Sequence, residues 1–252
     1  MALELDAVTV AVGRARLIAD VSLSVTPGKL TIVLGANGAG KSTALAALAG
    51  DIRPAQGEAR LDGVPLTAIA PRELASRRAV VLQHTPLNFA LQVHEVIALS
   101  RTTLGLRGDA ADEIEERALG VLGLVPLAAR DYSTLSGGER QRAQIARALA
   151  QLWHHADGGV PGYLLMDEPT AHLDLKHQII ALEAARSFAD EGGGALCILH
   201  DLALAREFSD EVVLMNAGRI AARGEARALL TAPRIAEIFD VPEQRAERFA
   251  VL

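Results

Sequence analysis

The sequence predicts an α/β fold built on a mostly parallel sheet, and three observations lead to this prediction. Short apolar segments of strand length alternate with helical segments in both halves of the chain, as in parallel sheets with crossover helices. Between the halves, from about 93 to 129, apolar residues follow a helical spacing, which predicts a helical insertion. Half of the 252 residues are hydrophobic, so the chain can bury the core of one large domain.

The first strands are expected near the N-terminus. Residues 3–12 alternate between apolar and polar types, and a second strand is predicted at 21–25. The segment KLTIVLG (29–35) reads as a buried strand that leads directly into a glycine-rich turn. Residues 41–49 are rich in alanine and leucine and should form a helix that ends at Gly50.

Four further strands are predicted along the rest of the chain, with helices between the last three. They are AVVLQ (79–83), YLLMD (163–167), ALCIL (195–199) and EVVLM (211–215). Cys197 is the only cysteine and lies within one of them. It should be a buried strand residue in a reducing compartment.

Charge and hydropathy disfavour nucleic-acid partners and membrane spans. The net charge is −6 and no long basic run occurs, so binding to a polyanion is not expected. Scattered arginines such as Arg77 and Arg78 are expected on a solvated face. No uncharged apolar stretch reaches the roughly 18 residues that a bilayer requires, and the first residues lack the layout of a signal peptide. We therefore expect a soluble, cytosolic protein.

The segment GANGAGKST matches the phosphate-loop pattern G-x-x-x-x-G-K-[ST], in which backbone N–H groups surround an anion. Lys41 should reach the β- and γ-phosphates, and Ser42 should offer its hydroxyl to Mg²⁺. A chance glycine-rich turn is the alternative, and the strand before and helix after the motif disfavour it. The predicted nucleotide-binding residues are Gly35, Ala36, Asn37, Gly38, Ala39, Gly40, Lys41, Ser42 and Thr43.

Two adjacent acids, Asp167 and Glu168, end the apolar segment LLMDEPT (164–170) and should emerge at the carboxyl edge of the sheet. Adjacent side chains on a strand point to opposite faces, so the two carboxylates should have different tasks. We expect Asp167 to hold Mg²⁺ and Glu168 to act as general base toward a water molecule. A surface acidic pair is the alternative reading.

Two more polar side chains follow predicted strands. His200 comes after ALCIL and is a candidate contact of the γ-phosphate, although a histidine in this position is often only a loop residue. Gln83 ends AVVLQ in the same way, and its amide could bind Mg²⁺ or the water. Gln83 and His200 are therefore counted with Glu168 as candidate catalytic residues.

The segment LSGGERQR (135–142) is a second phosphate-binding pattern. Ser136, Gly137 and Gly138 offer a hydroxyl and bare N–H groups at the start of a helix, with Glu139 beside them. An ordinary capping box made by Ser136 and Glu139 is the simpler reading. However, the run is more specific than a cap requires, and it points to a nucleotide shared between two copies of the chain.

With these motifs the chain resembles the ATP-binding cassette (ABC) family over nearly its whole length, from about 3 to 241. In the family's order, the motifs are the Walker A segment GANGAGKST, the Q-loop residue Gln83, the signature LSGGERQR, the Walker B segment LLMDEPT, the D-loop AHLD (171–174) and the switch histidine His200.

The resemblance implies a fold and a division of the chain. A P-loop NTPase core with a mostly parallel sheet should carry an N-terminal antiparallel β subdomain and an inserted helical subdomain. The single domain of 1–252 should have its α/β core at 1–86 and 136–252. The helical part should lie at about 87–135 and continue into the helix after 136.

The resemblance also implies partners. A dimer should close on two ATP molecules with Mg²⁺, each held by one chain's phosphate loop and the other chain's Ser136 to Gly138. Closure should drive a polytopic permease dimer at the cytoplasmic face of the membrane, and hydrolysis through Glu168 should reopen the dimer. The segment near 87–101 should receive a short cytoplasmic helix of the permease.

The subgroup can be narrowed by resemblance. The segment QHTPLNFALQVHEVIALSR (83–101) is similar to that of importers for iron chelates, heme and cobalamin, and ADGGVPGYLLMDEPTAHLDLKHQ (156–178) resembles hemin-import ATPases. An extracytoplasmic heme-binding protein would then be an indirect partner. A ferric-siderophore or cobalamin importer is the alternative. A soluble ABC protein acting on DNA or ribosomes would need a coiled-coil insertion, zinc-binding cysteines or a second cassette.

One departure from the family pattern concerns the base of the nucleotide. Val12 stands where the family usually stacks adenine on an aromatic ring, so this stacking should be either lost or replaced by Arg14 or Arg16. We therefore expect loose discrimination between ATP and GTP. His154 and His155 could in principle bind heme iron, but exposed loop positions are the preferred reading.

Overall fold

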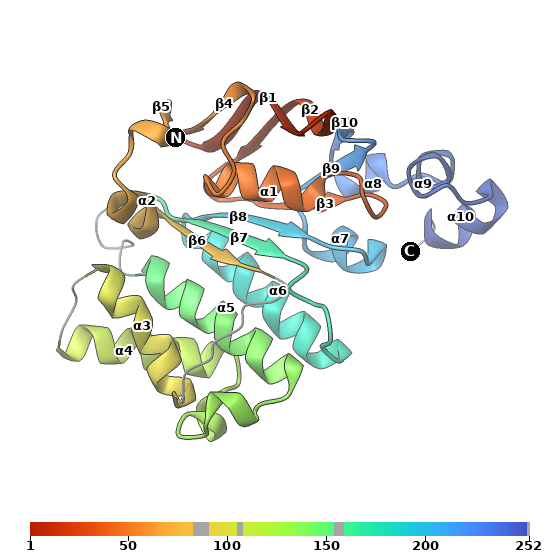
Figure 1. The fold of residues 1–252 in the computed structure, drawn as a ribbon. Coiled ribbons are helices and arrows are strands. Elements are labelled where there is room, and N and C mark those ends of the chain that lie inside the picture. The colour runs from red at the N-terminus through yellow and green to blue at the C-terminus, as the bar shows by residue number, and fades with distance from the viewer. Residues whose placement is uncertain (83–90, 105–107, 154–158, 251–252) are drawn as a thin grey trace.

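Two sheets with one helix between them form the frame of the molecule (Figure 1). The computed structural model describes residues 1–82, 91–104, 108–153 and 159–250. In this part of the chain a six-stranded sheet has the order β10-β9-β3-β8-β7-β6, parallel except for β10. A four-stranded antiparallel sheet has the order β2-β1-β4-β5. The predicted α/β class, with its mostly parallel sheet and its N-terminal antiparallel sheet, is confirmed.

The strands have the following bounds: β1 Leu3–Val12, β2 Ala15–Val25, β3 Leu30–Leu34, β4 Gln56–Leu61, β5 Val64–Pro65, β6 Arg78–Val81, β7 Tyr163–Asp167, β8 Gly194–Ile198, β9 Glu211–Asn216 and β10 Arg219–Gly224. The α-helices have these bounds: α1 Lys41–Ala49, α2 Pro71–Arg77, α3 Val93–Leu104, α4 Asp109–Val121, α5 Gly137–Trp153, α6 Leu175–Asp190, α7 Leu202–Phe208, α8 Ala226–Leu229, α9 Ala232–Phe239 and α10 Glu243–Ala250. Short 3₁₀ turns lie at 66–68, 125–127 and 132–134.

Strand β3 runs through the centre of the larger sheet. All five of its residues are buried, because helix α1 covers one face of the sheet and helices of the other layer cover the opposite face. This explains why its sequence is a continuous apolar run rather than an alternating one. Cys197 on the neighbouring strand β8 is also buried, as predicted, and burial raises the pKa of its thiol.

Helix α1 lies between the two sheets (Figure 1). It spans the predicted residues and ends at Gly50, whose φ of 76° lets its N–H reach the carbonyls of Ala46 and Ala47. Its alanines and leucines pack against strands of both sheets, so a single short helix supplies much of the second core cluster.

Helices occupy the region where the sequence predicts an insertion. Val93, Val96 and Ile97 are fully buried on α3, which packs on α5, and Ala118 on α4 faces the same cluster. The helical spacing is therefore confirmed for these residues. The domain boundaries at 86 and 136 stay a prediction.

Two strands differ in length from their predictions. Strand β2 begins six residues earlier than the predicted 21, because Ala15 to Ile18 pair with the end of β1. Strand β6 ends at Val81, and Gln83 lies outside the described residues. No helix in the described ranges is both long and apolar enough to cross a membrane.

The expectation that Arg77 and Arg78 lie on a solvated face is wrong. Arg77 is only 14% exposed and binds Asp62, with 2.7 Å between its Nη2 and Oδ2 of the carboxylate. The same carboxylate accepts hydrogen bonds from the N–H of Ala2 and the hydroxyl of Tyr163. Burial, and secondarily the Asp62 carboxylate, raise the pKa of Tyr163, so its hydroxyl remains a donor. Arg78 is likewise half-buried, and burial lowers its pKa.

We predict that Asp62→Asn lowers the free energy of unfolding by about 1–3 kcal/mol. One acceptor oxygen becomes the NH₂ donor of an amide, which then faces another donor, either Arg77 or the N–H of Ala2. Asparagine tolerates the left-handed backbone at this position, where φ is 52°. Urea unfolding measures the change. Asp6→Asn is the control, because Oδ2 of Asp6 lies 3.7 Å from Nη1 of Arg60 at the surface. This substitution should change the free energy of unfolding by less than about 1 kcal/mol. Equal effects of the two variants would contradict this role of Asp62.

Candidate functional site

The predicted phosphate loop joins β3 to α1 at the carboxyl edge of the larger sheet. Asp167 ends β7 and His200 follows β8, so both come to this same edge. A hollow of about 890 Å³ lies there. Its lining residues are Arg16, Leu17, Asn37, Gly38, Ala39, Gly40, Lys41, Ser42, Thr43, Glu168, His200, Ala217 and Gly218.

Glycine is required at two positions of the loop. Gly40 has a φ of 93°, and a Cβ there would lie 2.6 Å from Cγ2 of Ile18. At Gly35 a Cβ would lie 2.2 Å from the carbonyl oxygen of Met215. The loop is therefore pressed against strand β9 on one side and strand β2 on the other. This holds its backbone N–H groups in a fixed arrangement.

The ammonium group of Lys41 is folded over the loop. Its Nζ donates to the carbonyls of Gly35 at 2.8 Å and Ala36 at 3.0 Å, and the residue is only 6% exposed. Burial lowers the pKa of Lys41, while the carboxylates of Glu168 and Asp167 oppose that shift. An anion in the hollow would favour the charged amine further.

The residues beside Lys41 fit a Mg²⁺ ion. One carboxylate oxygen of Asp167, Oδ1, is buried and has no hydrogen-bond partner among the described residues. Burial raises the pKa of Asp167, and a hydrogen bond from Ser42 opposes the shift. A buried carboxylate oxygen with no donor suits a hard cation, which Mg²⁺ sites typically bind through one or two carboxylates and phosphate oxygens.

The structure brings Glu168 and His200 into direct contact. Nε2 of His200 lies 2.7 Å from Oε1 of Glu168 at the rim of the hollow. Glu168 has a φ of 50°, so the chain turns sharply after β7 and its carboxylate leaves the strand direction. A neutral His200 that donates from Nε2 must carry its proton there, which orients the carboxylate.

The segment Ser136–Gly138 opens helix α5 with a capping box. The Ser136 N–H donates to Oε2 of Glu139 at 2.7 Å, and the Glu139 N–H meets the Ser136 hydroxyl at 3.3 Å. These bonds lower the pKa of Glu139. Among the described residues that line the hollow, none comes from this segment. Thus a single chain does not place its second phosphate-binding pattern at its own phosphate loop.

Part of the lining of the first hollow was not predicted from the sequence. Ala217 and Gly218 form the turn between β9 and β10, both with positive φ, and nothing in the sequence signals that this turn lies beside the phosphate loop. Arg16 lines the hollow, whereas Val12 is 66% exposed at the end of β1. The replacement of the aromatic ring by Arg14 or Arg16 stays a prediction. Gln83, residues 87–90, His154 and His155 lie outside the described residues.

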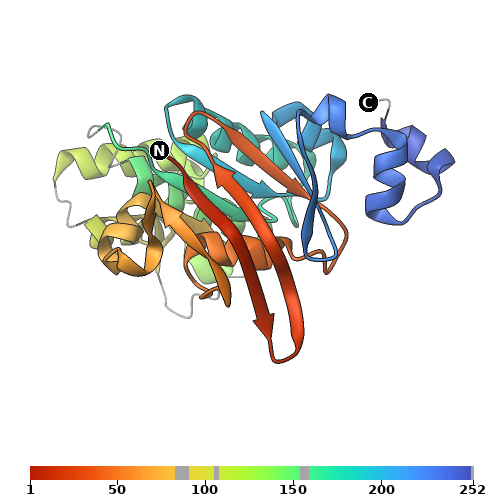
Figure 2. The ribbon, with the colours of Figure 1, turned by 90° about the horizontal axis from the view of Figure 1, so that it is seen from above.

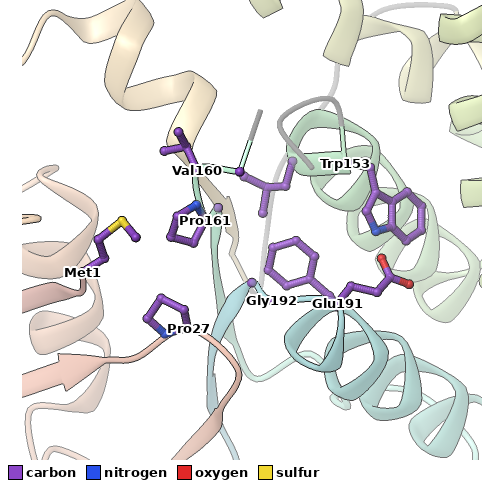
Figure 3. A pocket seen from close by; sticks show the side chains of 12 residues that line it. Met1, Pro27, Trp153, Val160, Pro161, Glu191 and Gly192 are labelled. Carbon is purple, nitrogen blue, oxygen red and sulfur yellow. The ribbon is translucent and has the colours of Figure 1, made fainter. Parts of the chain in front are cut away.

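A second cavity of about 270 Å³ lies at the opposite, amino-terminal end of β7 and β8 (Figure 3). Phe188 fills the space beside Gly193, where a Cβ would lie 2.3 Å from its ring. The guanidinium of Arg117 stacks 4.0 Å from the ring centre of Trp153, which also lines this cavity. None of the described site residues predicted from the sequence lines this cavity.

Comparisons with known proteins agree with this geometry. The family model described as "ABC transporter" matches residues 18–171. The hemin import ATP-binding protein HmuV of Rhodopseudomonas palustris is 45% identical over 240 residues, covering 95% of this chain and 88% of that protein. The protein of the same name from Agrobacterium fabrum is 42% identical, covering 90% of this chain and 86% of its own length.

Two solved structures share the fold. An ATP-binding subunit of an ABC transporter superposes with a TM-score of 0.80 at 23% identity, covering all of both chains. An ATP-binding cassette of an ABC transporter in its ADP conformation has a TM-score of 0.79 at 25% identity, covering 94% of this chain and 98% of its own. With the phosphate loop, the acids after β7 and the histidine after β8 at one sheet edge, this chain belongs to the ABC transporter family.

Proposed function

We propose that this chain is the ATP-hydrolysing subunit that powers import of heme through a partner permease. The contact between Glu168 and His200, in the same hollow as Lys41 and the phosphate loop, carries the proposal. It supplies an acceptor for the proton of an attacking water next to a site built for phosphates. The names of the relatives in two bacteria support heme as the cargo.

The phosphate loop and the polar residues beside it have separate proposed roles. The loop N–H groups from Gly35 to Thr43 bind the β-phosphate region, and Lys41 turns from the loop carbonyls toward the γ-phosphate. Ser42 and Asp167 hold Mg²⁺, with Gln83 as a further proposed ligand. The ion would neutralise charge on the phosphate oxygens.

Hydrolysis needs a water aligned with the γ-phosphate. Glu168 accepts its proton as general base. His200, whose Nε2 lies against that carboxylate here, is the proposed contact of the γ-phosphate. Gln83 is the third proposed catalytic residue. The leaving ADP remains on the phosphate loop until the site opens.

The second phosphate-binding segment completes the site from another copy of the chain. Ser136, Gly137, Gly138 and Glu139 lie outside the hollow of their own chain. We infer that they cover the γ-phosphate of the partner's ATP in a two-fold dimer. Dimer closure would then depend on ATP and drive the permease from the cytoplasmic face of the membrane. An extracytoplasmic heme-binding protein would deliver the cargo.

Replacing Glu168 by Gln should keep ATP binding and lower the rate of hydrolysis by about 10²–10⁴-fold, because the amide cannot accept the proton. A fluorescent ATP analogue measures affinity, and phosphate release measures turnover. Lys41→Ala is the contrasting variant and should weaken binding itself. Retained steady-state hydrolysis in Glu168→Gln would remove Glu168 from its proposed role.

Ser136→Asp separates phosphate binding from helix capping. Aspartate caps a helix as well as serine does, so the melting temperature should change little. Its charge, however, should repel the partner's γ-phosphate and lower dimeric ATP hydrolysis by at least about tenfold. Ser136→Ala loses the cap as well and serves as the comparison. If Ser136→Asp hydrolysed ATP at the wild-type rate, the residue would be only a cap.

The cargo is tested by transport into proteoliposomes that contain the chain with its permease. Heme delivered by its binding protein should be imported with ATP hydrolysis, and complexes with the Glu168→Gln chain should import none. Ferric siderophore and cobalamin are the competing cargoes. Import of either one in place of heme would keep the ATPase assignment and reject heme.

A further inference from the structure

The structure assigns to Gln178 a positioning role in the proposed hydrolysis: its amide holds the turn that links the catalytic Glu168 to the phosphate-binding segment at Gly138. This inference rests on the proposed function and deepens it. Gln178 lies in the first turn of helix α6, immediately after the D-loop segment. Nothing in the sequence analysis singled it out.

The turn between Glu168 and helix α6 is held by few backbone bonds. The N–H of Ala171 donates to the Glu168 carbonyl at 3.1 Å, and the N–H of Leu173 donates to the Thr170 carbonyl at 3.3 Å. Two residues other than glycine have left-handed backbones here, with φ of 50° at Glu168 and 63° at His172. Such conformations cost free energy and persist only where neighbouring contacts hold them.

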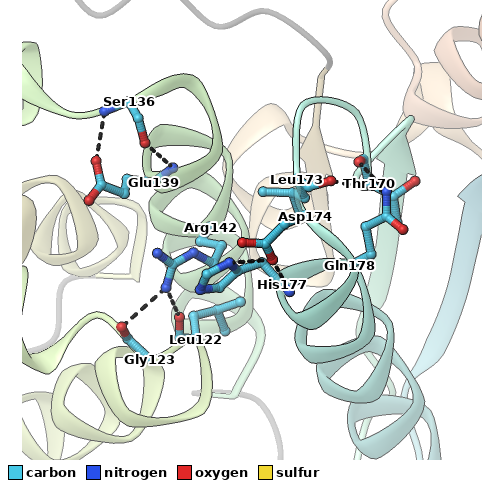
Figure 4. A network of polar contacts seen from close by, with 10 residues as sticks. All are labelled: Leu122, Gly123, Ser136, Glu139, Arg142, Thr170, Leu173, Asp174, His177 and Gln178. Carbon is cyan, nitrogen blue, oxygen red and sulfur yellow. Dashed lines mark hydrogen bonds and ion pairs between the residues drawn. The ribbon is translucent and has the colours of Figure 1, made fainter.

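Gln178 supplies such contacts. Its Nε2 donates to the carbonyls of Leu173 at 3.1 Å and Thr170 at 3.4 Å, so one amide binds two carbonyls of the turn (Figure 4). The helix that carries Gln178 is itself anchored, because Asp174 caps it by accepting from the His177 N–H at 2.9 Å. The turn is thus tied to a rigid element.

The other side of the turn meets the second phosphate-binding segment. A Cβ added at Gly138 would lie 3.0 Å from Cδ2 of Leu173 and 3.1 Å from the carbonyl oxygen of His172. The turn therefore lies against Gly138 with no spare room. Any shift of Leu173 moves it into or away from the segment that we propose binds the partner's ATP.

A buried arginine of helix α5, Arg142, ties this helix to the segment that follows α4. Arg142 donates from Nη1 to the carbonyls of Leu122 at 2.7 Å and Gly123 at 3.1 Å. Its guanidinium interacts electrostatically with Glu139 and Asp174, which belong to the capping box and to the cap of α6 (Figure 4). Helix α5 is thus held in place, so we expect loss of the Gln178 bonds to loosen the turn rather than the helix.

The test compares Gln178→Leu with Gln151→Leu in the full-length chain. Gln151 is a matched control, because its Nε2 also donates to two backbone carbonyls, those of Ala75 and Arg78, away from the turn. Both variants should lose a similar amount of stability. Only Gln178→Leu should lower kcat, by about tenfold or more, with unchanged affinity for a fluorescent ATP analogue. In a Glu168→Gln background it should also weaken ATP-dependent dimer formation, measured by gel filtration.

Gln178→Glu provides a second readout if the leucine variant folds poorly. A carboxylate facing two carbonyls repels them, whereas the neutral acid regains one donor. The ratio of the variant's rate to the wild-type rate should therefore rise as the pH falls, and no such rise should occur for Gln178→Leu.

The outcomes separate this inference from the function on which it rests. If the wild-type chain hydrolyses ATP and Gln178→Leu behaves like Gln151→Leu, the positioning role is wrong. A loss of ATP affinity equal to the loss of kcat would overturn it as well, because it would indicate general damage. If the wild-type chain neither hydrolyses ATP nor dimerises as Glu168→Gln, the proposed function is wrong, and the inference with it.

Discussion

The site depends on the parallel pairing of β8 with β3 and β7, in a register that ends the three strands at the same level. Val33 of β3 pairs with Ile198 of β8, and Ile198 pairs with Asp167 of β7. The three strands therefore end at the same height, and their next residues enter loops on the same edge. A shift of one residue in any pairing would turn that strand's side chains to the opposite face. The residues that follow these strands, including the loop after β3 and His200 after β8, therefore come to one edge together with Asp167. Seen from above, the antiparallel strands β1 and β2 lie side by side as one long pair (Figure 2).

Burial acts against the charged forms of two groups at this edge, the ammonium of Lys41 and the carboxylate of Asp167. Burial lowers the pKa of Lys41 and raises that of Asp167, so the fold disfavours the charged form of each group. A triphosphate and a divalent cation would reverse both effects, because each brings an opposite charge to its partner. Charged ligands of these two kinds would therefore favour the charged forms of Lys41 and Asp167.

The segment Ser136–Glu139 has an observed structural role and a proposed role in phosphate binding. Ser136 and Glu139 cap helix α5, so the simple structural reading of the sequence is correct. Gly137 and Gly138 are the first two residues of this helix, where backbone N–H groups have no acceptor within the helix itself. Gly138 lies close to Leu173 and His172, in the turn that follows Glu168 of the same chain. The Gln178 bonds give that turn a definite position.

The α/β class, the phosphate-loop motif and the acid pair Asp167–Glu168 could be predicted from the sequence alone. Each depends on a local pattern in which only certain residue types can stand. The glycines of the loop and the continuous apolar run of β3 could be read without any tertiary contact. Which distant residues come into contact could be seen only in the tertiary structure. The contact between Glu168 and His200 spans 32 residues, and the turn at Ala217 and Gly218 reaches the phosphate loop from far along the chain. Arg77 shows the same limit, since its burial depends on Asp62 and Tyr163 from other elements, and no local pattern records such a partner.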